Sequence, residues 1–257
     1  MTDAVAMAGA EVRIGGRRIL GPFDLVIGAG ERWVLLGPNG SGKTTALSLI
    51  GARRQPSAGT VDVLGQRLGR TDVRALRPRI GHVSHRVADA LRGEATVLDT
   101  VLTGRDATLV TWWQRFDADD EVRAHALLAS IGCDELAGRA LATCSLGERQ
   151  RVLIARALFG EHELLLFDEP AAGLDLPARE RLLAAMTDAA GPTSVLATHH
   201  LEEIPATTTH AALLRDGRVL AAGAIEDVVV EEGLSACFAM PIVVGRAGGR
   251  WTARAEG

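Results

Sequence analysis

The chain has 257 residues, 47% of them hydrophobic, which is enough for one large domain with its own core. Its net charge of −4 gives no sign of a nucleic-acid partner. No apolar run is long enough to predict a transmembrane helix, and no basic amino-terminal segment predicts a signal peptide. The three cysteines are widely spaced, as in proteins of a reducing compartment, so we expect a cytoplasmic protein.

The predicted elements alternate between strands and helices, which indicates an α/β fold with a doubly wound sheet. An antiparallel β part is expected at about residues 10–35 and 58–64. A buried strand at 33–36 precedes a helix that starts at Thr44, and helical spacing of apolar residues appears at 96–104 and 119–131. An Asp-Gly turn predicts a hairpin at 211–220. The tail after Ile225 has no assigned role.

The segment between the strand at 33–36 and the helix after it matches the phosphate-binding P-loop pattern, with both glycines, a lysine and a threonine in place. Lys43 is the only lysine among the 28 basic residues, which indicates a specific need for an ammonium group here. We expect Lys43 to reach the β- and γ-phosphates and the Thr44 hydroxyl to bind Mg²⁺. The predicted nucleotide-binding residues are Gly37, Pro38, Asn39, Gly40, Ser41, Gly42, Lys43, Thr44 and Thr45.

A second apolar run, at residues 164–167, ends in the acids Asp168 and Glu169. Open α/β sheets carry their ligand chemistry at such strand ends. We expect Asp168 to hold Mg²⁺, directly or through water, and Glu169 to act as the general base on the attacking water.

Between these motifs, Ser145 and Glu148 form a capping-box pattern, which by itself predicts only the start of a helix. The Ser145 hydroxyl and the Gly147 amide would also suit a second phosphate-binding surface. Such a surface is redundant beside a P-loop in the same chain, so we expect it to face the nucleotide of a second chain.

The order of these motifs resembles the nucleotide-binding domains of ABC ATPases over nearly the whole chain. The resemblance adds a D-loop at residues 172–175, with Asp175 at the nucleotide, and makes His199 the switch histidine. It implies a P-loop NTPase core with a flanking antiparallel β part and an inserted helical subdomain. The implied ATPase domain spans 1–225, with its core at 1–85 and 159–222 and its helical part at about 86–158, followed by an extension at 226–257.

Three positions depart from the family pattern. The signature has Leu146 where the family usually has glycine. Ile14 occupies the place of the aromatic residue that usually stacks on adenine, and the chain has no tyrosine, so adenine would pack either on an aliphatic face or on an arginine plane. His85 occupies the place of the Q-loop glutamine, where it either helps to hold Mg²⁺, directly or through water, or contacts neither metal nor partner.

The resemblance implies an ATP- and Mg²⁺-dependent ATPase that works as a homodimer or as a heterodimer with another ABC ATPase. Its role would be to drive separate membrane permease subunits from the cytoplasmic face, with no nucleic acid involved. The alternative is a stand-alone ABC ATPase that acts on cytosolic machinery such as repair or cofactor assembly. A small-molecule P-loop kinase would leave Ser145, Asp175 and His199 unexplained.

Overall fold

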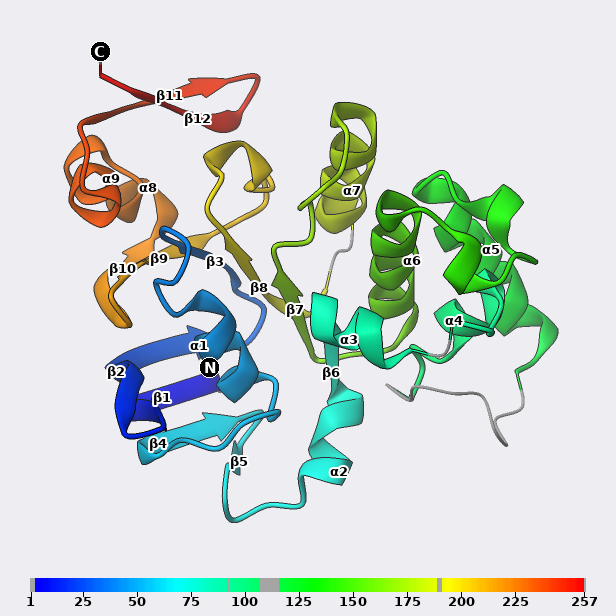
Figure 1. The fold of residues 1–257 in the computed structure, drawn as a ribbon, viewed down its shortest axis with the longest axis horizontal. Coiled ribbons are helices and arrows are strands. Elements are labelled where there is room, and N and C mark those ends of the chain that lie inside the picture. Colours follow the sequence, from blue (N-terminus) through cyan, green and yellow to red (C-terminus); the bar gives the residue numbers. More distant parts are fainter. Residues whose placement is uncertain (1–2, 92, 107–115, 189–190, 257) are drawn as a thin grey trace. The chain divides into compact units, whose positions relative to one another are not determined.

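A computed structural model describes residues 3–91, 93–106, 116–188 and 191–256 of this protein (Figure 1). The chain divides into two compact units, a first unit of residues 1–76 and 191–257 and a second unit of residues 77–190. No helix in the described part of either unit is long and apolar enough to cross a membrane.

The first unit begins with an antiparallel sheet in the order β2-β1-β4-β5. Its strands are β1 (Asp3–Ile14), β2 (Arg17–Gly28), β4 (Ala58–Val63) and β5 (Gln66–Arg67). In β2 the buried Phe23, Leu25 and Ile27 alternate with exposed residues, as in a sheet with one buried face. The predicted β part is therefore confirmed, but it starts earlier, at Asp3.

The same unit contains a second sheet segment in which β3 is the central strand, in the order β10-β9-β3-β8. β3 pairs in parallel with both β8 and β9, and residues 33–36 are buried on both faces, which explains their continuous apolar run. Asp216 and Gly217 form the predicted hairpin turn between β9 and β10, both at positive φ. The strands are β3 (Arg32–Leu36), β8 (Thr193–Thr198), β9 (His210–Arg215) and β10 (Arg218–Ala224).

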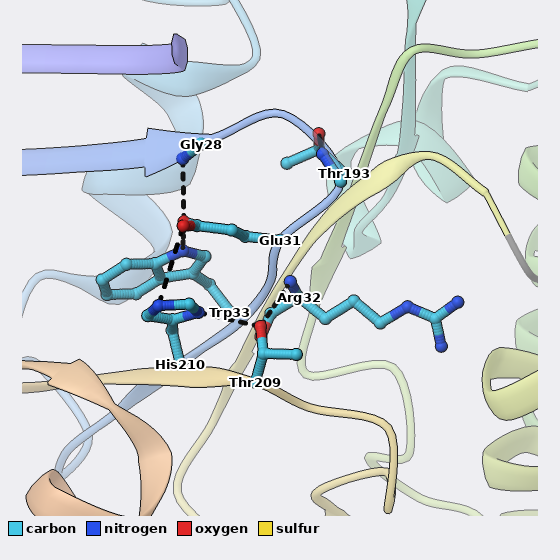
Figure 2. A network of polar contacts seen from close by, with 8 residues as sticks. Gly28, Glu31, Arg32, Trp33, Thr193, Thr209 and His210 are labelled. Atoms are coloured by element: carbon cyan, nitrogen blue, oxygen red, sulfur yellow. Dashed lines mark hydrogen bonds and ion pairs between the residues drawn. The ribbon is translucent and has the colours of Figure 1, made fainter. Parts of the chain in front are cut away.

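A polar network ties the amino ends of β3 and β9 together (Figure 2). The Glu31 carboxylate accepts hydrogen bonds from Trp33 Nε1 at 2.7 Å and from the Gly28 amide at 2.8 Å. His210 stacks on Trp33, with ring centroids 4.9 Å apart, and its Nε2 lies 3.7 Å from Glu31. Burial raises the pKa of Glu31, but these hydrogen bonds and His210 lower it overall. The network fixes the sheet at the end opposite to the loop that follows Leu36.

The helices of the first unit are short. They are α1 (Lys43–Ile50), α2 (Val73–Leu76), the 3-10 turn η4 (Leu201–Glu203), α8 (Ile225–Val228) and α9 (Glu231–Phe238). After α9 the chain ends in a hairpin of β11 (Ile242–Ala247) and β12 (Arg250–Ala255) (Figure 1). Residues 226–256 of the expected extension thus form helices and a hairpin that belong to the first unit.

The second unit combines two parallel strands with most of the helices. Its strands are β6 (Ile80–Val83) and β7 (Leu164–Asp168), and its helices and 3-10 turns are η1 (Arg77–Arg79), α3 (His85–Ala90), α4 (Val97–Leu102), α5 (Ala118–Ser130), η2 (Asp134–Leu136), η3 (Leu141–Thr143), α6 (Leu146–Phe159) and α7 (Leu176–Asp188). Val101, Leu128 and Phe159 belong to one core cluster that joins α4, α5 and α6. The helices predicted at 96–104 and 119–131 are confirmed.

Candidate nucleotide-binding and hydrolysis site

The predicted P-loop lies between β3 and α1, as the sequence indicated. Gly42 occupies the N-cap of α1 in the left-handed conformation, with φ 104°, and no side chain caps this helix end. At Gly37 a Cβ atom would lie 2.1 Å from the Leu214 carbonyl oxygen, so only glycine fits this close approach. Because no side chain caps α1, its amino terminus is available to an anion.

Two buried polar side chains point to a phosphate ligand at this loop. The Lys43 ammonium donates hydrogen bonds to the carbonyls of Gly37, at 2.7 Å, and Pro38, at 3.1 Å, while the residue is only 5% exposed. Ser41 Oγ is buried and has no hydrogen-bond partner within the described part of the chain. A buried hydroxyl without a partner is costly unless a ligand satisfies it. The loop therefore fits the phosphates of a nucleotide.

The remaining predicted residues of the loop differ in exposure. Asn39, Gly40 and Thr44 are exposed, whereas Pro38 and Thr45 are partly buried. A Cβ atom on Gly40 would meet no atom within 4 Å, so the loop is open on this side. The Thr44 hydroxyl is an oxygen ligand of the kind that Mg²⁺ prefers.

His199 belongs to the same unit as the P-loop and directly follows β8. The parallel register pairs Thr198 with Leu36, the residue before Gly37. His199 is partly buried and its ring lies 4.0 Å, between centroids, from the ring of exposed His200. Sheet register therefore brings the predicted switch histidine and the P-loop to the same edge of the first unit.

The predicted acids lie in the second unit, at the end of β7. Asp168 is 9% exposed, and Glu169 follows it with a left-handed backbone, φ 48°, which is strained for a residue with a side chain. β6 and β7 run parallel with Val83 opposite Phe167, so the start of α3 and the two acids follow neighbouring strand ends.

His85 is the first residue of α3, whose N-cap Ser84 accepts a hydrogen bond from the Val87 amide. The side chain of His85 lies outside the described part of the structure, so its predicted metal role stays a prediction. Among the described residues, no group of three or more His, Cys, Asp or Glu side chains forms a metal site.

The signature segment forms the predicted capping box at the start of α6. Ser145 Oγ accepts a hydrogen bond from the Glu148 amide at 3.3 Å, and the Glu148 carboxylate accepts one from the Ser145 amide at 2.7 Å. The hydrogen bonds that the Ser145 amide and hydroxyl donate to the Glu148 carboxylate lower the pKa of this group. Cys144 is buried beside them.

The D-loop packs against the signature segment within the second unit. Asp175 Oδ1 accepts a 2.9 Å hydrogen bond from the Ala178 amide in the first turn of α7. A Cβ atom on Gly147 would lie 3.5 Å from Leu174, and one on Gly173 would lie 3.5 Å from Leu146. Leu146 itself is 62% exposed, so the leucine that replaces the family's glycine is available to a second chain.

Two residues whose contacts support the site were not predicted from the sequence. Gln150, buried on α6, donates a hydrogen bond to the carbonyl of Pro170. Glu203, buried in η4, accepts one from the Thr198 hydroxyl. Neither residue has a spacing that signals its role, although buried polar side chains are rarely without a structural partner.

A family model described as "ABC transporter" matches residues 20–172, more than half of the chain. The chain belongs to the ABC transporter family. An uncharacterized ABC transporter ATP-binding protein of Bacillus subtilis, YlmA, is 37% identical over 234 residues, which cover 89% of this chain and 88% of the relative. The cobalt import ATP-binding protein of Rhodobacter capsulatus, CbiO, is 36% identical over 219 residues, which cover 84% of this chain and 76% of the relative.

A solved structure supports the same ABC fold. A dimeric ATP-binding cassette in a post-hydrolysis state, bound to ADP and Pi, has a TM-score of 0.74 and 25% identity, covering 86% of this chain and 98% of that one. The α/β architecture expected from the sequence is thereby confirmed, as is membership of the ABC family.

Proposed function

We propose that this chain is the ATP-binding and ATP-hydrolysing subunit of an ABC transporter, working as a head-to-tail dimer that powers separate membrane subunits. The proposal is carried by the P-loop, where Lys43 is buried and where, among the residues that the structure describes, the Ser41 hydroxyl has no hydrogen-bond partner and no side chain caps the helix amino terminus. In an ABC chain, this arrangement supports binding of ATP phosphates.

On the first unit, Lys43 would exchange its contacts with the Gly37 and Pro38 carbonyls for the β- and γ-phosphates of ATP. Backbone amides of residues 39–45 would hold the remaining phosphate oxygens. His199 would contact the γ-phosphate and orient the water. The adenine would pack on the aliphatic side chain of Ile14, which is 52% exposed at the end of β1.

On the second unit, Glu169 would take a proton from the attacking water, and its strained backbone supports a functional role. Thr44 of the first unit and Asp168 of the second unit would each offer an oxygen ligand that suits Mg²⁺, with His85 as a further candidate ligand. When bound, the ion would neutralise charge on the transferred phosphate.

Ser145, Gly147 and Asp175 would act on the nucleotide of a second chain. Ser145 and the amino terminus of α6 would offer a surface for phosphate; they lie in the second unit, whereas the P-loop lies in the first. Either another copy of this chain or a different ABC ATPase would complete the dimer.

A membrane permease would be a separate polypeptide, and the chain would be held at the inner face of the membrane through it. The name of CbiO supports a transport role of this kind. The relatives described above carry transporter names, and nothing in them favours a stand-alone ATPase of cytosolic machinery.

The test uses Glu169→Gln, which should bind ATP but not complete hydrolysis, so that ATP traps the dimer. Size-exclusion chromatography with light scattering should show a dimer with Mg-ATP and a monomer without it. Glu161→Gln, which changes an exposed glutamate shortly before β7, is the matched control and should not trap a dimer. A Glu169→Gln chain that stays monomeric with ATP would contradict the proposal.

The partner is tested with tagged Glu169→Gln and ATP in detergent-solubilised membranes of the source cells. A stoichiometric polytopic membrane protein, identified by mass spectrometry, would support the transporter role. Recovery of soluble proteins alone would favour the cytosolic alternative.

A further inference from the structure

Glu203 is a buried acid outside every motif that the sequence predicted. It lies at the end of η4, is 6% exposed, and its carboxylate accepts a hydrogen bond from the Thr198 hydroxyl. Thr198 is fully buried as the last residue of β8. Burial of a carboxylate is unfavourable without good partners, so this contact calls for a structural or functional reason.

Further hydrogen bonds hold the backbone next to His199. Thr198 Oγ1 also accepts a 3.1 Å hydrogen bond from the His200 amide, and the Glu203 amide donates to the His200 carbonyl at 3.3 Å. Thr198 is thus bonded directly to the buried Glu203 carboxylate, and His200 is bonded to the Thr198 hydroxyl and to the Glu203 amide. Rotation of the turn that aims the imidazole would require these bonds to break.

This turn begins beside the P-loop. Thr198 pairs with Leu36, which directly precedes Gly37, so Glu203 supports the strand end from which His199 emerges. A small shift of this strand end would move the imidazole relative to the phosphate loop within the same unit.

The carboxy-terminal hairpin supports the same turn from outside. Arg250, the first residue of β12, donates a hydrogen bond to the Glu202 carbonyl in η4, and β12 packs against η4. The neighbouring Trp251 is 8% exposed, with the Arg246 guanidinium 4.0 Å from its ring centroid. The hairpin is therefore anchored where it meets η4.

We propose that Glu203 is a positioning residue for ATP hydrolysis, which acts by fixing the turn that carries His199, and that the hairpin stabilises this turn through Arg250. The inference rests on the proposed ATPase function, because His199 has a catalytic role only there. It also gives the carboxy-terminal extension a role in hydrolysis.

The first test compares hydrolysis with ATP binding in the full-length chain. Glu203→Ala should lower kcat about tenfold or more, because a misplaced group reacts poorly. The Kd for ATP should stay within about twofold, since Lys43 and the P-loop are unchanged. Glu203→Gln keeps an oxygen that accepts from Thr198 and should recover most of kcat. Equal losses in binding and hydrolysis, or no recovery with glutamine, would overturn the proposal.

The second test is a double-mutant cycle with His199, measured by single-turnover hydrolysis of radiolabelled ATP. If Glu203 acts through His199, Glu203→Ala should change the residual rate of His199→Ala by less than about twofold. An undiminished tenfold loss in that background would overturn the proposal. If Glu203→Ala does not fold, Thr198→Val removes the same hydrogen bond, Thr198→Ser should restore it, and the same cycle applies.

The hairpin is tested by Arg250→Ala against Arg254→Ala, an exposed arginine of the same strand. Arg250→Ala should lower kcat several-fold in the wild-type chain and hardly at all with His199→Ala, whereas Arg254→Ala should leave kcat unchanged. Equal effects of the two variants would overturn the role of the hairpin. Absence of ATP hydrolysis by the wild-type chain would instead contradict the proposed function itself.

Discussion

The side-chain amide of Gln150 donates a 2.9 Å hydrogen bond to the carbonyl of Pro170, the residue that follows Glu169. Gln150 lies on α6, whose amino terminus carries the Ser145 capping box. One buried contact thus joins the signature helix to the turn that holds the proposed general base, within a single unit.

Replacing Gln150 by methionine should therefore affect stability and hydrolysis together. The variant keeps the side-chain volume but leaves the Pro170 carbonyl without its donor, which should lower the free energy of unfolding by about 1–3 kcal/mol. The rate of hydrolysis should fall because Glu169 loses support. Urea unfolding and phosphate release measure the two effects. Gln55→Met, at an exposed glutamine, is the control, and equal results for both variants would contradict this role.

Gly37→Ala should damage both the fold and ATP binding. The added methyl would overlap the Leu214 carbonyl oxygen, 2.1 Å away, so β9 or the P-loop must move, at a cost of about 1–3 kcal/mol. Thermal unfolding and titration with a fluorescent ATP analogue measure these losses. Gly138→Ala adds the same methyl where no atom lies within 4 Å and should be almost neutral. A Gly37→Ala chain as stable as Gly138→Ala would disprove the close approach.

His162 should make the protein less stable in mild acid. Burial lowers its pKa most strongly, a hydrogen bond to the Pro78 carbonyl raises it, and Arg156 lowers it, with a net lowering. An unfolded histidine binds a proton near pH 6.5. Between that pH and the lower pKa of the folded form, the unfolded chain therefore binds more protons and stability falls as pH falls.

The contribution of His162 is measured by urea unfolding across about pH 5 to 7.5. His162→Gln should flatten the decline of stability toward acid, whereas His125→Gln, at a half-exposed histidine of the same unit that pairs with Asp134, should leave most of this decline. An unchanged slope in His162→Gln would show that this histidine is not responsible.

Local sequence patterns predicted much of the fold and the motifs because these features are determined by interactions between residues close together in the sequence. The strand–loop–helix around Lys43, the capping box of Ser145 and the turn at Asp216 each depend on residues within a few positions. β1 was expected to begin at about residue 10 but begins at Asp3. The alanine-rich start of this strand was missed because alanine has low strand propensity. The segment forms a strand because it pairs with β2 and β4.

The missed residues, Gln150 and Glu203, act through side-chain contacts that sequence spacing does not reveal. Gln150 reaches Pro170 across the second unit, and Glu203 turns back to a hydroxyl five residues earlier. On a sequence, both look like ordinary polar residues of helical segments. Only burial and the identity of the bonded atom distinguish them.

Phosphate release from Mg-ATP by the purified full-length chain tests most directly whether Lys43 binds ATP and Glu169 promotes its hydrolysis. We expect steady release by the wild-type chain and almost none by Lys43→Ala or Glu169→Gln. Of the two variants, only Glu169→Gln should still bind ATP. Wild-type rates in either variant would contradict these roles of Lys43 and Glu169.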